Sequence, residues 1–189
     1  MTSTRLPASL ALAGSLVFAP AAVQAQDVPL KTVGGEQDRA GLVNVLNARL
    51  LSHASATLIL DAWCAERGLA PVGSKIIAER VRGQDKPASA EVRSALGVGD
   101  AEAVNYRRVR LRCGDVILSE ADNWYLPAAL TLEMNRTLET TDTSFGRVVA
   151  PLNFRRETIA ADVLWDGKGA APAFVLTHRA RLLTPEGRP

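Results

Sequence analysis

Residues 104–127, which decide the fold of this chain, are VNYRRVRLRCGDVILSEADNWYLP. Two runs of alternating apolar and polar residues flank Gly114-Asp115. Glycine at the first central position is typical of a type II′ turn, so the stretch predicts a β-hairpin. A two-residue turn sets the register of the strands on either side, and Cys113 is therefore expected opposite Val116.

The same register distributes the polar side chains of the hairpin between two faces. Counting outward from the turn pairs Arg107 with Asp122 at the rim and Tyr106 with Asn123 on the opposite face. Because side chains alternate along a strand, Arg108 is then a diagonal neighbour of Asn123. That face is either wet and basic, as in a half-buried sheet, or the wall of a cavity whose arginines bind a carboxylate.

The first 25 residues have the features of a secretory signal peptide. Arg5 supplies a positive start, residues 10–19 form a short apolar run, and residues 23–25 resemble a cleavage site. We therefore expect a periplasmic or secreted protein, without a membrane span after cleavage. Removing Arg5 from the 22 basic and 20 acidic residues leaves 21 against 20, a net charge of +1 that gives no argument for nucleic acid binding.

The chain after the predicted cleavage site has the length of one domain. We expect a flexible lead-in at 26–37, a single domain at 38–184 and a frayed tail at 185–189. Hydrophobic periodicity predicts the following elements besides the hairpin: helices at 38–51, 56–67, 89–96 and 128–139, and strands at 74–82, 152–165 and 173–184. This order predicts an α+β fold, an antiparallel sheet of about five to six strands with helices on one side.

Cys64 and Cys113 are the two cysteines of the chain. Export to an oxidising compartment favours a disulfide between them, and two separate buried thiols are the alternative. A bridge would close a loop of roughly 50 residues and stabilise the fold by about 4 kcal/mol. Two cysteines and two histidines at these spacings match no zinc-ligand pattern, so we predict no metal site.

Two further positions on predicted strands carry polar groups that a site could use. His178 lies on an apolar strand face, where it is either a hydrogen-bonded core residue or an acid–base group that titrates near neutrality. Arg155 and Arg156 are neighbours in a strand and point to opposite faces, so only one of them can face a cavity.

From Tyr106 to Pro127 the residues resemble those of the chorismate pyruvate-lyase family, whose enzymes split chorismate into 4-hydroxybenzoate and pyruvate. The resemblance continues through LETTDTSFGR at 138–147 and through 152–159, and it ends at His178. It implies an antiparallel sheet with helical flaps that close over a buried ligand. The related fold also occurs in effector-binding domains of transcription regulators, so it implies either an enzyme or a sensor.

The resemblance also implies positions for the site. Without a gap before Pro127, the arginine that binds the substrate carboxylate falls on Arg108, and the pocket glycine falls on Gly146. Asn123 stands where the family has a second arginine, and His178 stands where it has an essential glutamate.

These two substitutions, together with export, favour a binding protein for a small aromatic or anionic carboxylate. In that protein Arg108 pairs with the carboxylate, Asn123 and His178 hydrogen-bond the ligand, and Tyr106 or Tyr125 provides an aromatic wall. The alternative is a chorismate pyruvate-lyase or related eliminating enzyme in which His178 is the catalytic acid or base. A third hypothesis is a structural module whose cavity is filled by side chains. We predict no cofactor, and we expect a monomer.

Overall fold

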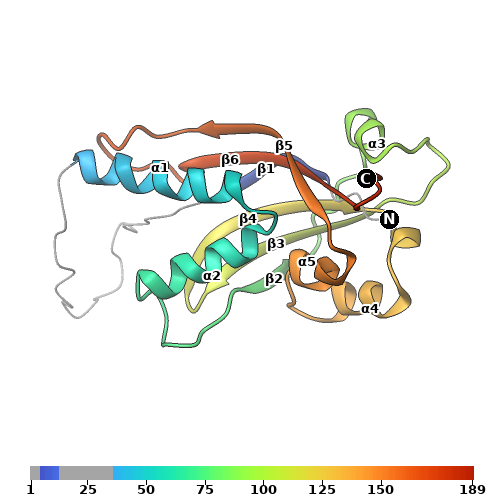
Figure 1. Cartoon of the computed structure of the whole chain (residues 1–189), viewed down its shortest axis with the longest axis horizontal. Helices are drawn as coiled ribbons and strands as arrows, with labels where there is room; N and C mark the ends of the chain where they lie inside the picture. Colours follow the sequence, from blue (N-terminus) through green and yellow to red (C-terminus); the bar gives the residue numbers. More distant parts are fainter. Residues whose placement is uncertain (1–4, 13–35) are drawn as a thin grey trace.

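The structure is a computed structural model that describes residues 5–12 and 36–189. It consists of an antiparallel sheet with helices packed against it (Figure 1). The strands are β1 (Arg5–Leu12), β2 (Ile77–Val81), β3 (Asn105–Cys113), β4 (Val116–Tyr125), β5 (Arg155–Val163) and β6 (Leu176–Leu183). Their order in the sheet is β2-β3-β4-β1-β6-β5. Every neighbouring pair is antiparallel, which confirms the α+β class.

The helices are α1 (Glu36–Ser52), α2 (Ala56–Glu66), α3 (Ala90–Leu96), α4 (Leu132–Thr140) and α5 (Phe145–Val149), with short 3-10 turns at Pro127–Ala129 and Ala150–Leu152. Side-chain oxygens of Ser55, Ser89 and Thr131 cap α2, α3 and α4 by accepting a backbone N–H three residues on. Helix α5 lies between the helix predicted at 128–139 and the strand predicted at 152–165, where the sequence predicts no helix. Its five residues are too few to show helical periodicity.

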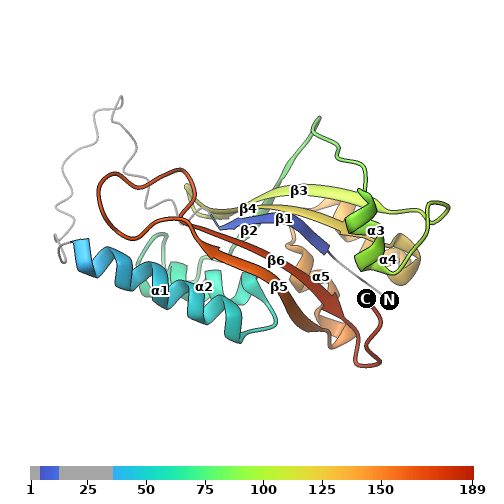
Figure 2. The ribbon, with the colours of Figure 1, turned by 90° about the horizontal axis from the view of Figure 1, so that it is seen from above.

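Both faces of the sheet carry helices. Helices α1 and α2 run along one face (Figure 2) and pack their apolar residues on Val109, Leu111 and Leu176. Helix α3 packs through Val92 and Leu96 against Trp124, which lies on the other face of β4. The prediction that helices lie on one side of the sheet is therefore wrong for α3.

A β-bulge in the hairpin shifts the predicted register by one residue. Cys113 faces Val116 as expected, but from Leu111 onward the partner is one position further along β4, because Leu118 is an extra residue there. Arg107 consequently faces Asn123, and Arg108 faces Asp122. The predicted pairs of Arg107 with Asp122 and of Tyr106 with Asn123 are both wrong.

The alternation of side chains along β3 decides which hairpin arginine is buried. Arg107 shares the core face with Val109 and Leu111 and is 1% exposed, whereas Arg108 is half-buried on the opposite face. The prediction that Arg108 shares a face with Asn123 is wrong because the bulge in β4 turns Asn123 to the face of Arg107.

Strand β1 lies within the predicted signal peptide. Its Arg5 is opposite Trp124 of β4 on one side and Arg181 of β6 on the other. Since β1 is antiparallel to both, β4 and β6 run parallel to each other. The predicted cleavage site after Ala25 and residues 26–35 of the predicted lead-in lie outside the described residues, while residues 36 and 37 belong to α1.

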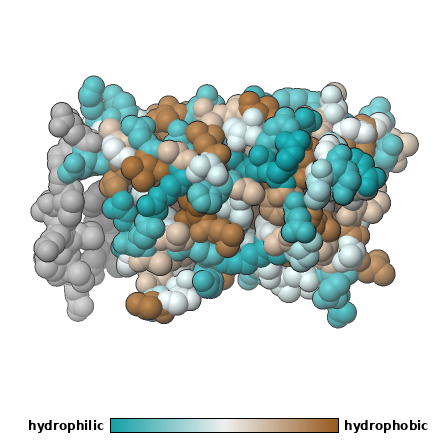
Figure 3. All heavy atoms as spheres, viewed as in Figure 1, coloured by the Kyte–Doolittle hydropathy of each residue, from teal (hydrophilic) through white to brown (hydrophobic). Residues whose placement is uncertain are grey.

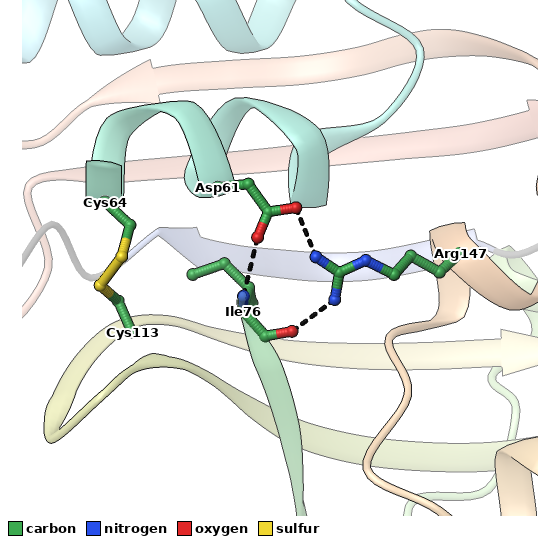
Figure 4. Close-up of a disulfide and its surroundings, with 5 residues drawn as sticks. All are labelled: Asp61, Cys64, Ile76, Cys113 and Arg147. Atoms are coloured by element: carbon green, nitrogen blue, oxygen red, sulfur yellow. Dashed lines mark hydrogen bonds and ion pairs between the residues drawn. A yellow bond between two sulfur atoms is a disulfide. The ribbon is translucent and has the colours of Figure 1, made fainter. Parts of the chain in front are cut away.

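The predicted disulfide between Cys64 and Cys113 is present, with 6.0 Å between the two Cα atoms (Figure 4). It joins the end of α2 to the end of β3 and holds the helix against the sheet. The face that carries α1, α2 and α5 mixes polar residues with small apolar patches (Figure 3). None of the helices in the described ranges is long and apolar enough to cross a bilayer.

Candidate ligand-binding cavity

A small cavity lies between the core face of the hairpin and the turn that joins α1 to α2, with α5, β5 and β6 around it. Residues from all these elements line it: Ala54, Ser55, Ala56, Val109, Leu111, Ala121, Asn123, Phe145, Gly146, Phe154, Arg156 and Leu182. Its volume of about 60 Å³ has room for a few water molecules. An aromatic ring therefore fits only if the wall moves outward.

Three of the lining residues, Ser55, Asn123 and Arg156, have polar side chains. None of the lining residues that the structure describes has a carboxylate, imidazole, thiol, phenol or ammonium group. The remaining wall is aliphatic and aromatic. Such a site resembles ligand pockets in general, where a few polar groups orient a ligand inside an apolar enclosure.

Arg156 is the cationic side chain of the cavity. Its Nη1 donates to the backbone oxygen of Leu50 at 3.1 Å and to Oγ1 of Thr158 at 2.9 Å, while Nη2 lies 3.5 Å from Nδ1 of His178. Its Nε is buried and makes no hydrogen bond. No carboxylate in the described ranges lies within salt-bridge distance of Arg156, and burial lowers the pKa of its guanidinium.

His178 lies beneath Arg156 and is fully buried. Its Nε2 is 2.7 Å from Oδ1 of Asn47 on α1. Burial, and next the positive charge of Arg156, lower the pKa of the imidazole to about 4. His178 is therefore neutral at physiological pH, and it is absent from the residues that line the cavity. The role of His178 as an acid or base therefore stays a prediction, which its position outside the cavity wall does not support.

Asn123, which the sequence predicts as a ligand contact, lines the cavity and is 5% exposed. Its Nδ2 donates to the backbone oxygen of Arg107 across the strand pair at 3.3 Å. Gly146 also lines the cavity, as the resemblance implies. A Cβ at Gly146 would come within 3.2 Å of Oγ of Ser55, so the glycine lets α5 approach the start of α2 closely.

Arg108 and Tyr106 lie on the outer face, away from the cavity. Arg108 donates to Glu120 at 2.7 Å, and this hydrogen bond raises the pKa of the guanidinium. The Tyr106 hydroxyl donates to Asp122, which also pairs with Lys86, and burial and Asp122 raise the pKa of the phenol. Neither Arg108 nor Tyr106 can contact a ligand in this cavity, and both predicted roles are corrected here.

Arg107, behind Asn123, organises the segment that leads into α5. It donates to the backbone oxygens of Thr143 at 3.0 Å and Thr141 at 3.1 Å. Burial, and next the charge of Arg80, lower the pKa of Arg107 to about 10. Since this segment precedes Phe145 and Gly146, Arg107 supports one wall of the cavity from behind.

Asp61 and Arg147 hold the opposite wall in place (Figure 4). Asp61 on α2 accepts the backbone N–H of Ile76 at 2.7 Å and forms an ion pair with Arg147. Arg147 in turn donates to the backbone oxygen of Ile76 at 2.5 Å. The ion pair thus connects α2 and α5 to the backbone of Ile76, just before β2. Asp61 lies about one helical turn before Cys64, which forms the disulfide.

No protein-family model matches this chain. The chain is 50% identical over 165 residues to the uncharacterized protein y4mC of Sinorhizobium fredii (strain NBRC 101917 / NGR234), and the match covers 78% of this chain and 70% of that protein. The chain belongs to the y4mC family. The name of this relative states no activity, so membership in the y4mC family carries no function over to this chain.

Sequence reasoning missed Arg156 and Asn47 as members of the site. The strand pattern does say that one of Arg155 and Arg156 faces inward, and the structure shows that it is Arg156. The signal for Asn47 is weaker, because an asparagine on the polar side of an amphipathic helix is ordinary. Its contact with His178 joins residues 131 positions apart and depends on tertiary packing.

Proposed function

We propose that this protein binds a small carboxylate, preferably an aromatic one, in this cavity, with Arg156 as the residue that pairs with the carboxylate. The observation that carries the proposal is a half-buried guanidinium on the cavity wall, with a buried Nε and without an acidic partner in the described part of the chain. Burying a charge without a counter-charge is costly, and such a cost is commonly offset by a ligand of opposite charge.

The hydrogen bonds of Arg156 support a carboxylate in particular. A guanidinium has five N–H donors, and the protein occupies two on Nη1 and one on Nη2. The free donors are then the one on Nε and one on Nη2. Two donors on neighbouring nitrogens match the two oxygens of a carboxylate, which a guanidinium can bind with parallel hydrogen bonds.

The rest of the wall supports an aromatic or otherwise apolar body for the ligand. Phe145, Phe154 and Leu182 surround the cavity together with aliphatic residues of β3 and β4. Asn123 and Ser55 are left to hydrogen-bond a polar substituent. The bulge at Leu118 adds to this picture: one gap there moves the arginine position of the resembling lyase family from Arg108 to the buried Arg107.

A binding role has more support than an eliminating enzyme. Breaking chorismate into 4-hydroxybenzoate and pyruvate moves a proton, and proton transfer in enzymes is performed by a positioned acid or base. The described lining residues include none, and His178 is turned toward Asn47 and Arg156. We also propose that the protein is exported, because the disulfide fits an oxidising compartment.

Calorimetric titration with benzoate and 4-hydroxybenzoate tests the proposed function, with benzyl alcohol as the uncharged comparison. We expect both acids to bind and benzyl alcohol to bind far more weakly. The Arg156→Gln variant should lose roughly 30-fold or more in affinity, since losing one partner of a buried charge pair costs about 2–5 kcal/mol.

Arg155→Gln is the matched control for this titration, because its side chain is 62% exposed and points away from the cavity. We expect it to change the affinity less than twofold. Equal losses in the two variants, or no binding of either acid by the unaltered protein, would show that the cavity is not a carboxylate site.

A further inference from the structure

We infer that His178 and Asn47 are positioning residues, which hold Arg156 in place for an anion through a neutral hydrogen-bonded chain. This inference rests on the proposed function, because it explains how the same guanidinium is kept ready for a ligand. Each residue comes from a different element: Asn47 from α1, His178 from β6 and Arg156 from β5.

The direction of the chain follows from the chemistry of its atoms. Oδ1 of Asn47 can only accept a hydrogen bond, so the imidazole proton resides on Nε2 of His178, 2.7 Å away. Nδ1 then carries a lone pair, and it faces Nη2 of Arg156 at 3.5 Å. Asn47 thereby selects the imidazole tautomer that can accept a hydrogen bond from the guanidinium.

A neutral acceptor in this position has a consequence for ligand binding. A carboxylate beneath Arg156 would form an ion pair with it inside the protein and would cancel the charge that attracts an anion. A neutral imidazole orients the guanidinium by a hydrogen bond and leaves its positive charge uncompensated. A histidine at position 178, where the chorismate pyruvate-lyase family has a glutamate, is thus suited to an anion-binding site.

The surroundings keep the imidazole neutral. His178 is completely buried, and the positive charge of Arg156 is next to it. Asp162 is the acidic group that acts in the opposite sense, and its side chain is exposed, while Asn47 on α1 is uncharged. Burial and Arg156 prevail, and the pKa of His178 falls to about 4.

Charge substitution at position 178 tests the inference on the full chain, with benzoate as the probe. We expect His178→Glu to bind benzoate more than tenfold more weakly, because the new carboxylate competes for Arg156. His178→Gln, which keeps one acceptor and one donor group without a charge, should lose much less. Urea denaturation confirms that each variant is folded, and His53→Glu, at an exposed histidine, is the matched control.

Wild-type affinity in His178→Glu, or equal losses in the Glu and Gln variants, would overturn the inference. A second measurement separates it from the proposed function, because it needs no ligand. In ¹⁵N NMR spectra of the imidazole at about pH 5.5, between the lowered and the ordinary pKa, we expect a neutral ring protonated on Nε2. Asn47→Leu should abolish the preference for that tautomer.

A ring that is protonated on Nδ1, or that titrates near its ordinary pKa, would overturn the positioning chain even if benzoate binds. Conversely, the expected NMR result in a protein that does not bind benzoate would support the chain while the proposed carboxylate function fails.

Discussion

Leu118 decides which residues of β4 lie opposite the two adjacent arginines of β3. As the extra residue of a β-bulge, it turns the following part of β4 by one position relative to β3. Arg107 lies on the core face because side chains alternate along β3, and the bulge brings Asn123 opposite it. Arg108 points to the outer face, where it pairs with Glu120 and Asp122.

These roles predict a large difference in stability between two alanine variants. Arg107→Ala should lower the free energy of unfolding by roughly 2–4 kcal/mol, because it leaves a cavity and deprives two backbone oxygens of their donor. Arg108→Ala should cost less than about 1 kcal/mol, since it removes a half-exposed ion pair. Urea denaturation of both variants is the measurement, and similar losses would contradict the observed register.

At the scale of elements, the two ends of α2 have different roles. Its last turn is tied to β3 by the disulfide of Cys64 and Cys113, while Ser55, which caps the helix, and Ala56 line the cavity. The cavity holds only a few water molecules, so an aromatic acid requires part of the wall to move outward.

The disulfide should accordingly contribute to stability more than to affinity. We expect the Cys64→Ser, Cys113→Ser double variant to lose about 4 kcal/mol of unfolding free energy, for a loop closed between residues 49 positions apart. Its affinity for benzoate should change only slightly, because neither sulfur lines the cavity. Urea denaturation and calorimetry measure the two quantities. A large affinity loss in folded protein would mean that the disulfide also determines the shape of the cavity.

At the scale of the whole molecule, the sheet brings distant parts of the chain around one cavity. Its wall combines the α1–α2 turn, the hairpin, α5, β5 and β6, yet it lacks an acid or base in the described residues. This arrangement is the one expected for the carboxylate-binding role that we propose. Strand β1 lies between β4 and β6 in the same sheet.

We therefore predict that purified protein, incubated with chorismate, forms no 4-hydroxybenzoate beyond the uncatalysed background. The reason is that, among the described residues of the cavity wall, Arg156 is proposed to hold a carboxylate while none has a group that readily transfers a proton. Chromatographic detection of 4-hydroxybenzoate over time is the measurement, with boiled protein as the control. Steady turnover would restore the enzyme hypothesis and would require a proton-transferring group that reaches the cavity on wall opening.

Local patterns in the sequence by themselves determined the α+β class, most of the helix and strand positions, the hairpin turn and the cysteine pair. Each rests on interactions between residues near in sequence, or on a pairing of two cysteines that left little choice. Asn123 and Gly146, two residues predicted to contact a ligand, both line the cavity. Only the tertiary structure decided that Arg107 is buried, that Arg156 lines the cavity and that His178 contacts Asn47.

The physical reason is that these outcomes depend on small offsets and long-range packing. One extra residue at Leu118 reverses every side chain beyond it, and nothing in an alternating run of residues marks where a bulge will form. Contacts such as that between Asn47 and His178 exist only after α1 has docked on β6. A sequence pattern specifies the face of each element, whereas the packing of elements specifies which faces meet.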